Sequence, residues 1–307
     1  MKIMVFPECH CVFVGPIAHH PIVAQETDSF ILKNPVLEPQ MSKKTLALAA
    51  LTLVSGAVFA QAAPATTLTF NAGVVTDYRY RGITQSRNEA AVQGGVDYAH
   101  KSGFYVGAWA STIKWIADNS YTANSGGTRT GTDITGNVEL DVYGGYKFDL
   151  TKDVTMDVGY LRYQYLGNNL EATRTNVNAS SYNNANTNEI YTAITMGPIT
   201  AKYSYSMGDL FGYIDSKGSG YFDLSANFEV IPTWTVTPHF GRQTVTAAAY
   251  NASYNDMSLT VTKDLGKGLS ASLGYYGTNA ETSTYSSSFD GKFLGERGAV
   301  LGVKYNF

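Results

Sequence analysis

The last ten residues of the chain alternate apolar and other side chains with a period of two. In GAVLGVKYNF (298–307), every second residue from Ala299 to Phe307 is apolar, whereas the intervening row includes Lys304 and Asn306. Such alternation predicts a β-strand with one apolar and one polar face. The same pattern recurs in four earlier segments, 136–148, 154–165, 220–230 and 269–276.

A half-buried soluble sheet would also alternate, so the connections between the strands must decide. Tight connections alternate with long polar ones, and short turns at one rim with long loops at the other are typical of outer-membrane barrels. We therefore predict an all-β fold, a transmembrane up-and-down antiparallel β-barrel of about 12 strands, with both ends of the barrel segment on the short-turn side. The tight connections are 99–103, 149–153, 197–198, 231–233 and 264–268, and the long ones are 82–89, 114–134, 166–188, 208–219, 243–254 and 277–297.

Two strands are harder to interpret than the rest. In 104–113 both rows carry an aromatic residue, so the outward face stays open. Pro238 falls inside the strand 233–242, and because proline cannot donate to the ladder it suggests a bulge. The predicted strands are 67–81, 90–98, 104–113, 135–148, 154–165, 189–196, 199–207, 220–230, 233–242, 255–263, 269–276 and 298–307.

The segment 41–60 has the layout of a secretory signal peptide. Lys43 and Lys44 precede an uncharged apolar stretch. The residues at the end of this stretch predict cleavage after Ala60, with Ala62 and Ala63 as alternatives. The apolar stretch is shorter than the ~18–20 residues that a membrane-spanning helix needs, which argues against the alternative of an anchor. We expect residues 61–307 to form the mature barrel.

Residues 1–40 precede this signal peptide, which normally stands at the very N-terminus. We interpret them as a non-native extension from a start assigned upstream of Met41. Cys9 and Cys11 flank His10 too closely for a zinc site, and no second ligand pair follows. Both cysteines of the chain lie here, so the barrel segment must fold without disulfides.

Charged residues of both signs fall on the predicted inward rows. Such charges need water or one another, because burying them unpaired is costly. A polar pore lined by these residues is favoured over a closed interior filled with salt bridges, since about 12 strands enclose more space than side chains readily fill. Asp77, Arg79 and Arg81, near the outer rim, are the best candidates for a charged constriction. The pore-lining candidates are Asp77, Arg79, Arg81, Asp97, Glu139, Asp141, Lys147, Asp157, Lys202, Asp223, Glu229, Arg242 and Lys304.

The residues give little support to catalysis. After residue 60 the only histidines are His100, in a short turn, and His239, in the middle of a strand. A hydrolase at the outer rim would need a nucleophile beside a base, and no such pair is evident. We expect no enzymatic activity, cofactor or metal. The formal net charge of −3 shows no basic excess, so we expect no nucleic-acid partner.

Four long strings resemble one known family, the TorF-type putative porins of proteobacteria. They are GVVTDYRYRGITQS (73–86), QGGVDYAHKSGFYVGAWAS (93–111), YSYSMGDLFG (203–212) and DSKGSGYFDLSANFE (215–229). The resemblance covers essentially residues 67–307 and implies an outer-membrane barrel of porin type. It brings no catalytic residues, and residues 1–40 lie outside it.

Together these observations predict a channel for passive diffusion of small hydrophilic solutes in a Gram-negative outer membrane. The alternatives are an outer-membrane enzyme and a non-conducting structural barrel. The expected partners are membrane lipid and lipopolysaccharide outside the barrel, and the barrel assembly machinery, which would recognise the aromatic last strand Leu301–Phe307.

Overall fold

The computed structural model describes residues 66–121, 133–176, 179–180, 182–247 and 250–307, all within one compact unit, Ala47–Phe307. The predicted extension 1–40 and signal peptide 41–60 lie outside the described residues. Among the residues described, no helix is both long and apolar enough to span a bilayer.

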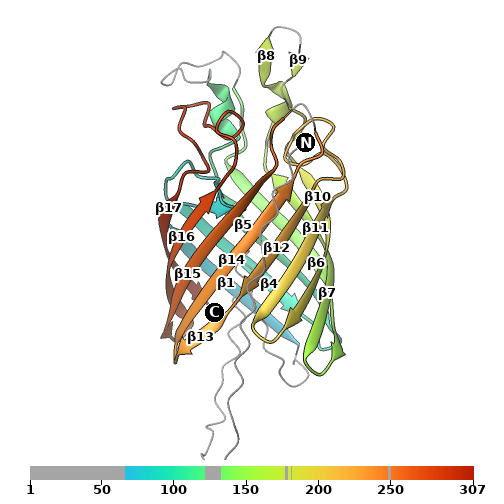
Figure 1. Cartoon of the computed structure of the whole chain (residues 1–307), viewed down its shortest axis with the longest axis vertical. Helices are drawn as coiled ribbons and strands as arrows, with labels where there is room; N and C mark the ends of the chain where they lie inside the picture. Colours follow the sequence, from blue (N-terminus) through green and yellow to red (C-terminus); the bar gives the residue numbers. More distant parts are fainter. Residues whose placement is uncertain (1–65, 122–132, 177–178, 181, 248–249) are drawn as a thin grey trace, which may run out of the picture. The chain divides into compact units, whose positions relative to one another are not determined.

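The described residues form a closed antiparallel β-barrel (Figure 1). Each wall strand pairs with its neighbours along the chain, and β1 pairs with β17 to close the sheet. The barrel of about 12 strands predicted from the sequence is thus confirmed. The wall strands are β1 (Thr67–Val75), β4 (Ala91–Ala99), β5 (Phe104–Thr112), β6 (Val138–Thr151), β7 (Val154–Tyr165), β10 (Thr187–Met196), β11 (Ile199–Ser206), β12 (Gly220–Ala226), β13 (Phe228–Ile231), β14 (Trp234–Thr244), β15 (Tyr254–Gly266), β16 (Leu269–Thr278) and β17 (Gly298–Asn306).

The wall has 12 strands because β12 and β13 are two parts of one strand, both paired with β14. The ladder is interrupted beside Pro238, which has no N–H to donate. Ser225 pairs with His239 and Phe228 pairs with Val236, so each strand advances by three residues and none is inserted. The bulge predicted at Pro238 is therefore wrong, because the proline breaks the ladder without shifting the register.

The connections alternate in length as predicted, with long loops at one rim and short turns at the other (Figure 1). We call the two halves of the interior the loop-side half and the turn-side half. The first strand ends at Val75 and not at residue 81, and the chain then forms a small separate hairpin. The elements within the loops are β2 (Arg79–Tyr80), β3 (Ile83–Thr84), η1 (Ala117–Ser120), η2 (Leu170–Ala172), β8 (Arg174–Asn176) and β9 (Ala179–Ser180).

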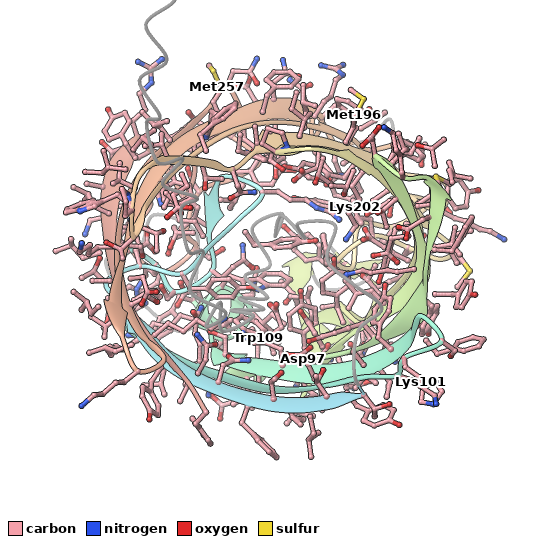
Figure 2. The ribbon with its side chains drawn as sticks, turned by 90° about the horizontal axis from the view of Figure 1, so that it is seen from below. Asp97, Lys101, Trp109, Met196, Lys202 and Met257 are labelled. Atoms are coloured by element: carbon pink, nitrogen blue, oxygen red, sulfur yellow. The ribbon has the colours of Figure 1, made fainter. Side chains whose placement is uncertain are left out.

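The outer surface of the wall is apolar. Large hydrophobic side chains are exposed along it, among them Leu68, Val92 and Met257, the last at 63% exposure. Figure 2 shows Met196 and Met257 projecting outward, whereas Asp97, Trp109 and Lys202 project inward. Water would be a poor solvent for such a surface, whereas lipid tails suit it.

Strand β5, whose face the sequence left open, directs Tyr105 and Trp109 into the barrel and Phe104 outward. Tyr105 lies across Gly145 of the neighbouring β6. A Cβ atom on Gly145 would lie 2.5 Å from both the Tyr105 hydroxyl and the Val158 carbonyl oxygen. Glycine is required at this position because the Tyr105 side chain lies directly over it.

We expect Gly145→Ala to lower the free energy of unfolding by about 1–3 kcal/mol, because the new methyl group overpacks the wall. Gly208→Ala is the matched control, since nothing lies within 4 Å of its Cβ position. Urea unfolding in detergent micelles measures both variants. Equal stability of the two variants would contradict the close packing described.

Candidate pore interior

A loop segment crosses the loop-side half of the barrel. We call residues 76–90, between β1 and β4, the inward segment. The Tyr78 hydroxyl donates to Glu139 on β6 (2.7 Å), and Arg81 reaches both β10 and β14. These strands lie in different parts of the wall, so the inward segment spans the lumen and narrows it.

Arg81 is the main electrostatic contact of the inward segment. Its Nη2 donates to both Glu189 carboxylate oxygens (3.0 and 2.8 Å), and its Nη1 donates to Gln243 Oε1 (2.7 Å). The guanidinium also lies 4.8 Å from the ring centroid of Tyr80 and 4.3 Å from that of Tyr221. Arg81 and Glu189 are both buried, so each charge depends on the other for stabilisation.

A second carboxylate holds the shape of the inward segment itself. Asp77 accepts hydrogen bonds from Arg79 Nε (2.6 Å), Thr84 and Ser86 (3.2 Å). Arg79 also donates to the Glu296 carbonyl oxygen (2.5 Å), which ties the segment to the loop before β17. The three residues predicted to form a constriction, Asp77, Arg79 and Arg81, therefore lie together in one folded hairpin at the mouth of the barrel.

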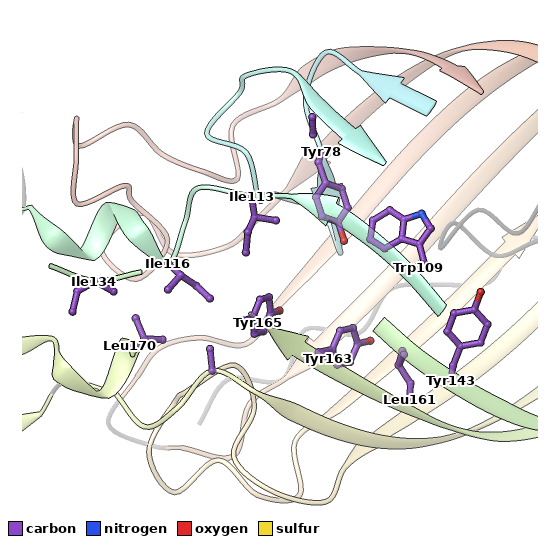
Figure 3. Close-up of a cluster of buried hydrophobic side chains, with 12 residues drawn as sticks. Tyr78, Trp109, Ile113, Ile116, Ile134, Tyr143, Leu161, Tyr163, Tyr165 and Leu170 are labelled. Atoms are coloured by element: carbon purple, nitrogen blue, oxygen red, sulfur yellow. The ribbon is translucent and has the colours of Figure 1, made fainter. Parts of the chain in front are cut away.

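A cluster of buried apolar side chains fills the space beside the inward segment. It contains Tyr78, Trp109, Tyr143, Tyr163 and Tyr165, together with aliphatic residues of the loops (Figure 3). The rings of Tyr78 and Trp109 meet edge to face at 5.4 Å. The loop-side half is thus packed like a protein core and is not an open tube.

The turn-side half has a different character. Its inward side chains stay partly exposed, and the Lys147 side chain keeps 34% of its exposure although it lies 3.7 Å from Asp157. Lys202 sits 4.0 Å from the Tyr191 ring centroid. Asp97 accepts a hydrogen bond from the Tyr143 hydroxyl (2.5 Å). This half of the lumen is polar and open to water.

The remaining predicted pore-lining residues divide into two groups. Glu139, Asp141, Asp223 and Lys304 project inward, as the alternation predicted. Arg242 does not, because it shares the outward row of β14 with Phe240 and donates to Asn255 on the outer surface (2.9 Å). Its assignment to the lumen was wrong, since the alternation that places His239 inside places Arg242 outside.

Glu229 lies on the inward row of β13, because it pairs with Thr235 of the inward row of β14. It is exposed in β13, close to the short turn, and accepts a hydrogen bond from the Thr233 backbone (3.1 Å). It therefore belongs to the inward row where that row meets the turn rim.

The sequence-based list also missed inward residues. Glu189, Gln243 and Asp256 are buried on the inner face, although none was selected. The signal was present for Glu189 and Asp256, because each alternates with outward apolar neighbours in a predicted strand.

His239 occupies a charged site on the inner wall. Its Nε2 lies 2.9 Å from Asp223, its Nδ1 lies 3.6 Å from Asp256, and the Tyr221 hydroxyl is 3.3 Å away. Among the described residues its polar partners include no serine, so the geometry provides no nucleophile–base pair at this histidine. His100 contacts Ser102 (2.7 Å), but this contact lies within a four-residue turn.

Three external loops meet around Asp118. Asp118 accepts hydrogen bonds from Arg87 of the inward segment (2.9 Å) and from Ser287 of the loop before β17 (3.2 Å). Burial raises the pKa of Asp118 to about 6, because the desolvation of the carboxylate outweighs the attraction of Arg87. Nearby, hydrogen bonds from Lys114 and Arg87 lower the pKa of Glu89.

We expect Arg81→Met to destabilise the protein by about 3–5 kcal/mol, because it leaves Glu189 buried without its partner. The double variant Arg81→Met, Glu189→Gln should recover most of that loss. Unfolding free energies of the two single variants and the double variant measure the coupling. Strictly additive effects would show that the ion pair does not hold the inward segment.

The raised pKa of Asp118 also predicts a pH dependence. The folded state binds this proton more tightly than the unfolded chain, so Asp118 favours folding below about pH 4, and that benefit is lost as the pH rises through about 6. Wild type should therefore lose stability relative to Asp118→Asn between pH 4 and pH 7, as measured by urea unfolding at both pH values. A difference in unfolding free energy between the two proteins that does not change with pH would contradict the buried environment of Asp118.

Comparison with solved structures finds porins among the similar folds. The KdgM porin aligns at 7% identity over 78% of this chain and 99% of its own, with a TM-score of 0.46. The NanC porin aligns at 10% identity over 78% and 99% of the two chains, also with a TM-score of 0.46. OprD of Pseudomonas aeruginosa aligns at 12% identity over 78% and 66%, with a TM-score of 0.35.

No curated protein matches the sequence. A family model described as "bacterial protein of unknown function (Gcw_chp)" matches residues 59–307, which include the whole barrel. The chain therefore belongs to the Gcw_chp family.

Proposed function

We propose that this protein is a porin-like channel of the outer membrane, of the TorF type, through which small hydrophilic solutes diffuse passively. One observation carries the proposal. The exterior is apolar, whereas the turn-side half of the lumen holds partly exposed charges of both signs, including Lys147, Asp157 and Lys202. A wet, charged interior inside an apolar wall suits the passage of polar solutes through lipid.

The inward segment would set the size limit of this channel. Its Arg81 contacts Glu189 and Gln243, whose strands lie apart in the wall, so solutes must pass beside the hairpin or displace it. Residue types near such a constriction determine which ions and solutes pass. The charges of the hairpin therefore belong to the selectivity machinery.

Two further parts of the proposal concern export and assembly. Residues 41–60 would direct export, and the last strand would be recognised by the barrel assembly machinery. The outward row of that strand supports the second point, since Leu301, Val303, Tyr305 and Phe307 are all exposed. Membrane lipid and lipopolysaccharide would cover the apolar exterior.

Purified protein in planar lipid bilayers should give stepwise ionic conductance. Lys202→Glu should shift the reversal potential in a KCl gradient toward cations, because it reverses a charge on the lumen wall. Lys152→Glu is the control, since Lys152 is 90% exposed in a short turn outside the lumen. A correctly folded, heat-modifiable barrel that never conducts would overturn the channel and favour a structural barrel.

A further inference from the structure

Asp141 on β6 is a fully buried carboxylate that has no hydrogen-bond partner among the described residues. Its exposure is 0%, and neither carboxylate oxygen accepts a hydrogen bond from any residue that the structure describes. An ionised carboxylate in this state is costly unless a positive group approaches it. The neighbouring Glu139 differs, because it accepts a hydrogen bond from the Tyr78 hydroxyl.

Aromatic side chains frame Asp141 on the inner face of the wall. Trp109 on β5 and Tyr163 on β7 are its direct cross-strand partners. Tyr143 follows two residues along β6 and so lies on the same face. All three rings belong to one buried cluster, and Figure 3 shows them grouped with Tyr78.

The charges around this frame are unbalanced. Glu139, Asp141 and Glu189 are all buried in the loop-side half. Arg81 is engaged with Glu189 and Gln243, and Arg79 with Asp77. Within the described part of the chain, no cationic side chain is therefore left to pair with Asp141.

The frame borders the wet half of the lumen. The Tyr143 hydroxyl donates to Asp97, a partly exposed carboxylate of the turn-side half. The Tyr143 hydroxyl therefore joins the frame around Asp141 to the wet half of the lumen.

We propose that Asp141, with the rings of Trp109, Tyr143 and Tyr163, binds small organic cations of the ammonium or guanidinium type, and that the channel admits them in preference to anions. The inference rests on the proposed channel function for its transport part only. Aromatic ring faces attract such cations, and a carboxylate supplies the matching charge. A chelated metal is a poorer match, because no group of three His, Cys, Asp or Glu side chains suited to a metal ion occurs among the described residues.

Methylammonium is a suitable probe for binding by the full chain in detergent. Methylammonium chloride should raise the temperature of the heat-modified gel shift above its value in NaCl at equal ionic strength. Asp141→Asn should weaken binding in calorimetry by about tenfold or more, because a charged hydrogen bond is lost. Asp153→Asn, in an exposed turn, should bind as wild type does.

Trp109→Leu provides a second variant, which keeps the carboxylate and removes one ring. It should bind methylammonium more weakly while its response to sodium stays the same. The site is overturned if wild type shows no preference for methylammonium over sodium, or if Asp141→Asn binds as wild type does. The second result would mean that Asp141 is buried as a neutral acid.

Reversal potentials in a methylammonium chloride gradient test the transport part. Wild type should prefer the cation, and Asp141→Asn should lose most of that preference. Binding without any conductance would contradict the channel and leave the site intact. Conductance without binding that depends on Asp141 would overturn the site and leave the channel intact.

Discussion

The closure of β1 against β17 is the constraint on which the rest of the structure depends. An open sheet with an apolar exterior would leave a row of peptide groups without partners, and lipid offers them none. Pairing from Asn71 with Asn306 to Val75 with Gly302 removes both edges. Once the sheet is closed, the period of two sends every second side chain into the lumen. The interior charges thus follow from the closed wall.

The two halves of the lumen stabilise these charges differently. On the turn side, water reaches Lys147 and Lys202, so their charges need no complete set of protein partners. On the loop side, the inward segment excludes water and supplies counter-charges, with Arg81 against Glu189 as the main pair. Asp141 is the exception, since its carboxylate accepts no hydrogen bond from the residues that the structure describes, and this is where we propose that a positive solute binds.

Most of the wall could be predicted from the sequence, because alternation and turn chemistry are local. The number of strands, the order of long and short connections and most inward residues follow from neighbours within a few positions. Arg242 was misplaced although the same local rule, applied through Phe240, puts it outside.

The inward segment could not be predicted in this way. Asp77, Arg79 and Arg81 continue the alternation of β1, so the pattern predicts that they belong to a strand. What bends the chain into the lumen is a set of distant contacts, and Glu189 lies 108 residues from Arg81. No local pattern encodes a partner at that separation. At Pro238 a local signal was misleading. The proline suggested a bulge, but the pairing of β14 with β12 and β13 on one side and with β15 on the other keeps the register.

Thiol labelling tests the division of the lumen most directly. Cys9 and Cys11 are first replaced by serine, and single cysteines are then placed at Ser272, Ser111 and Leu273. Ser272 projects into the turn-side half, Ser111 is 2% exposed on the loop side, and Leu273 is exposed outward. In lipid vesicles, a hydrophilic maleimide should label Ser272→Cys and leave the other two unlabelled, whereas a lipid-soluble maleimide should label Leu273→Cys. Rapid hydrophilic labelling of Ser111→Cys, or none of Ser272→Cys, would contradict a lumen that is wet on one side and packed on the other.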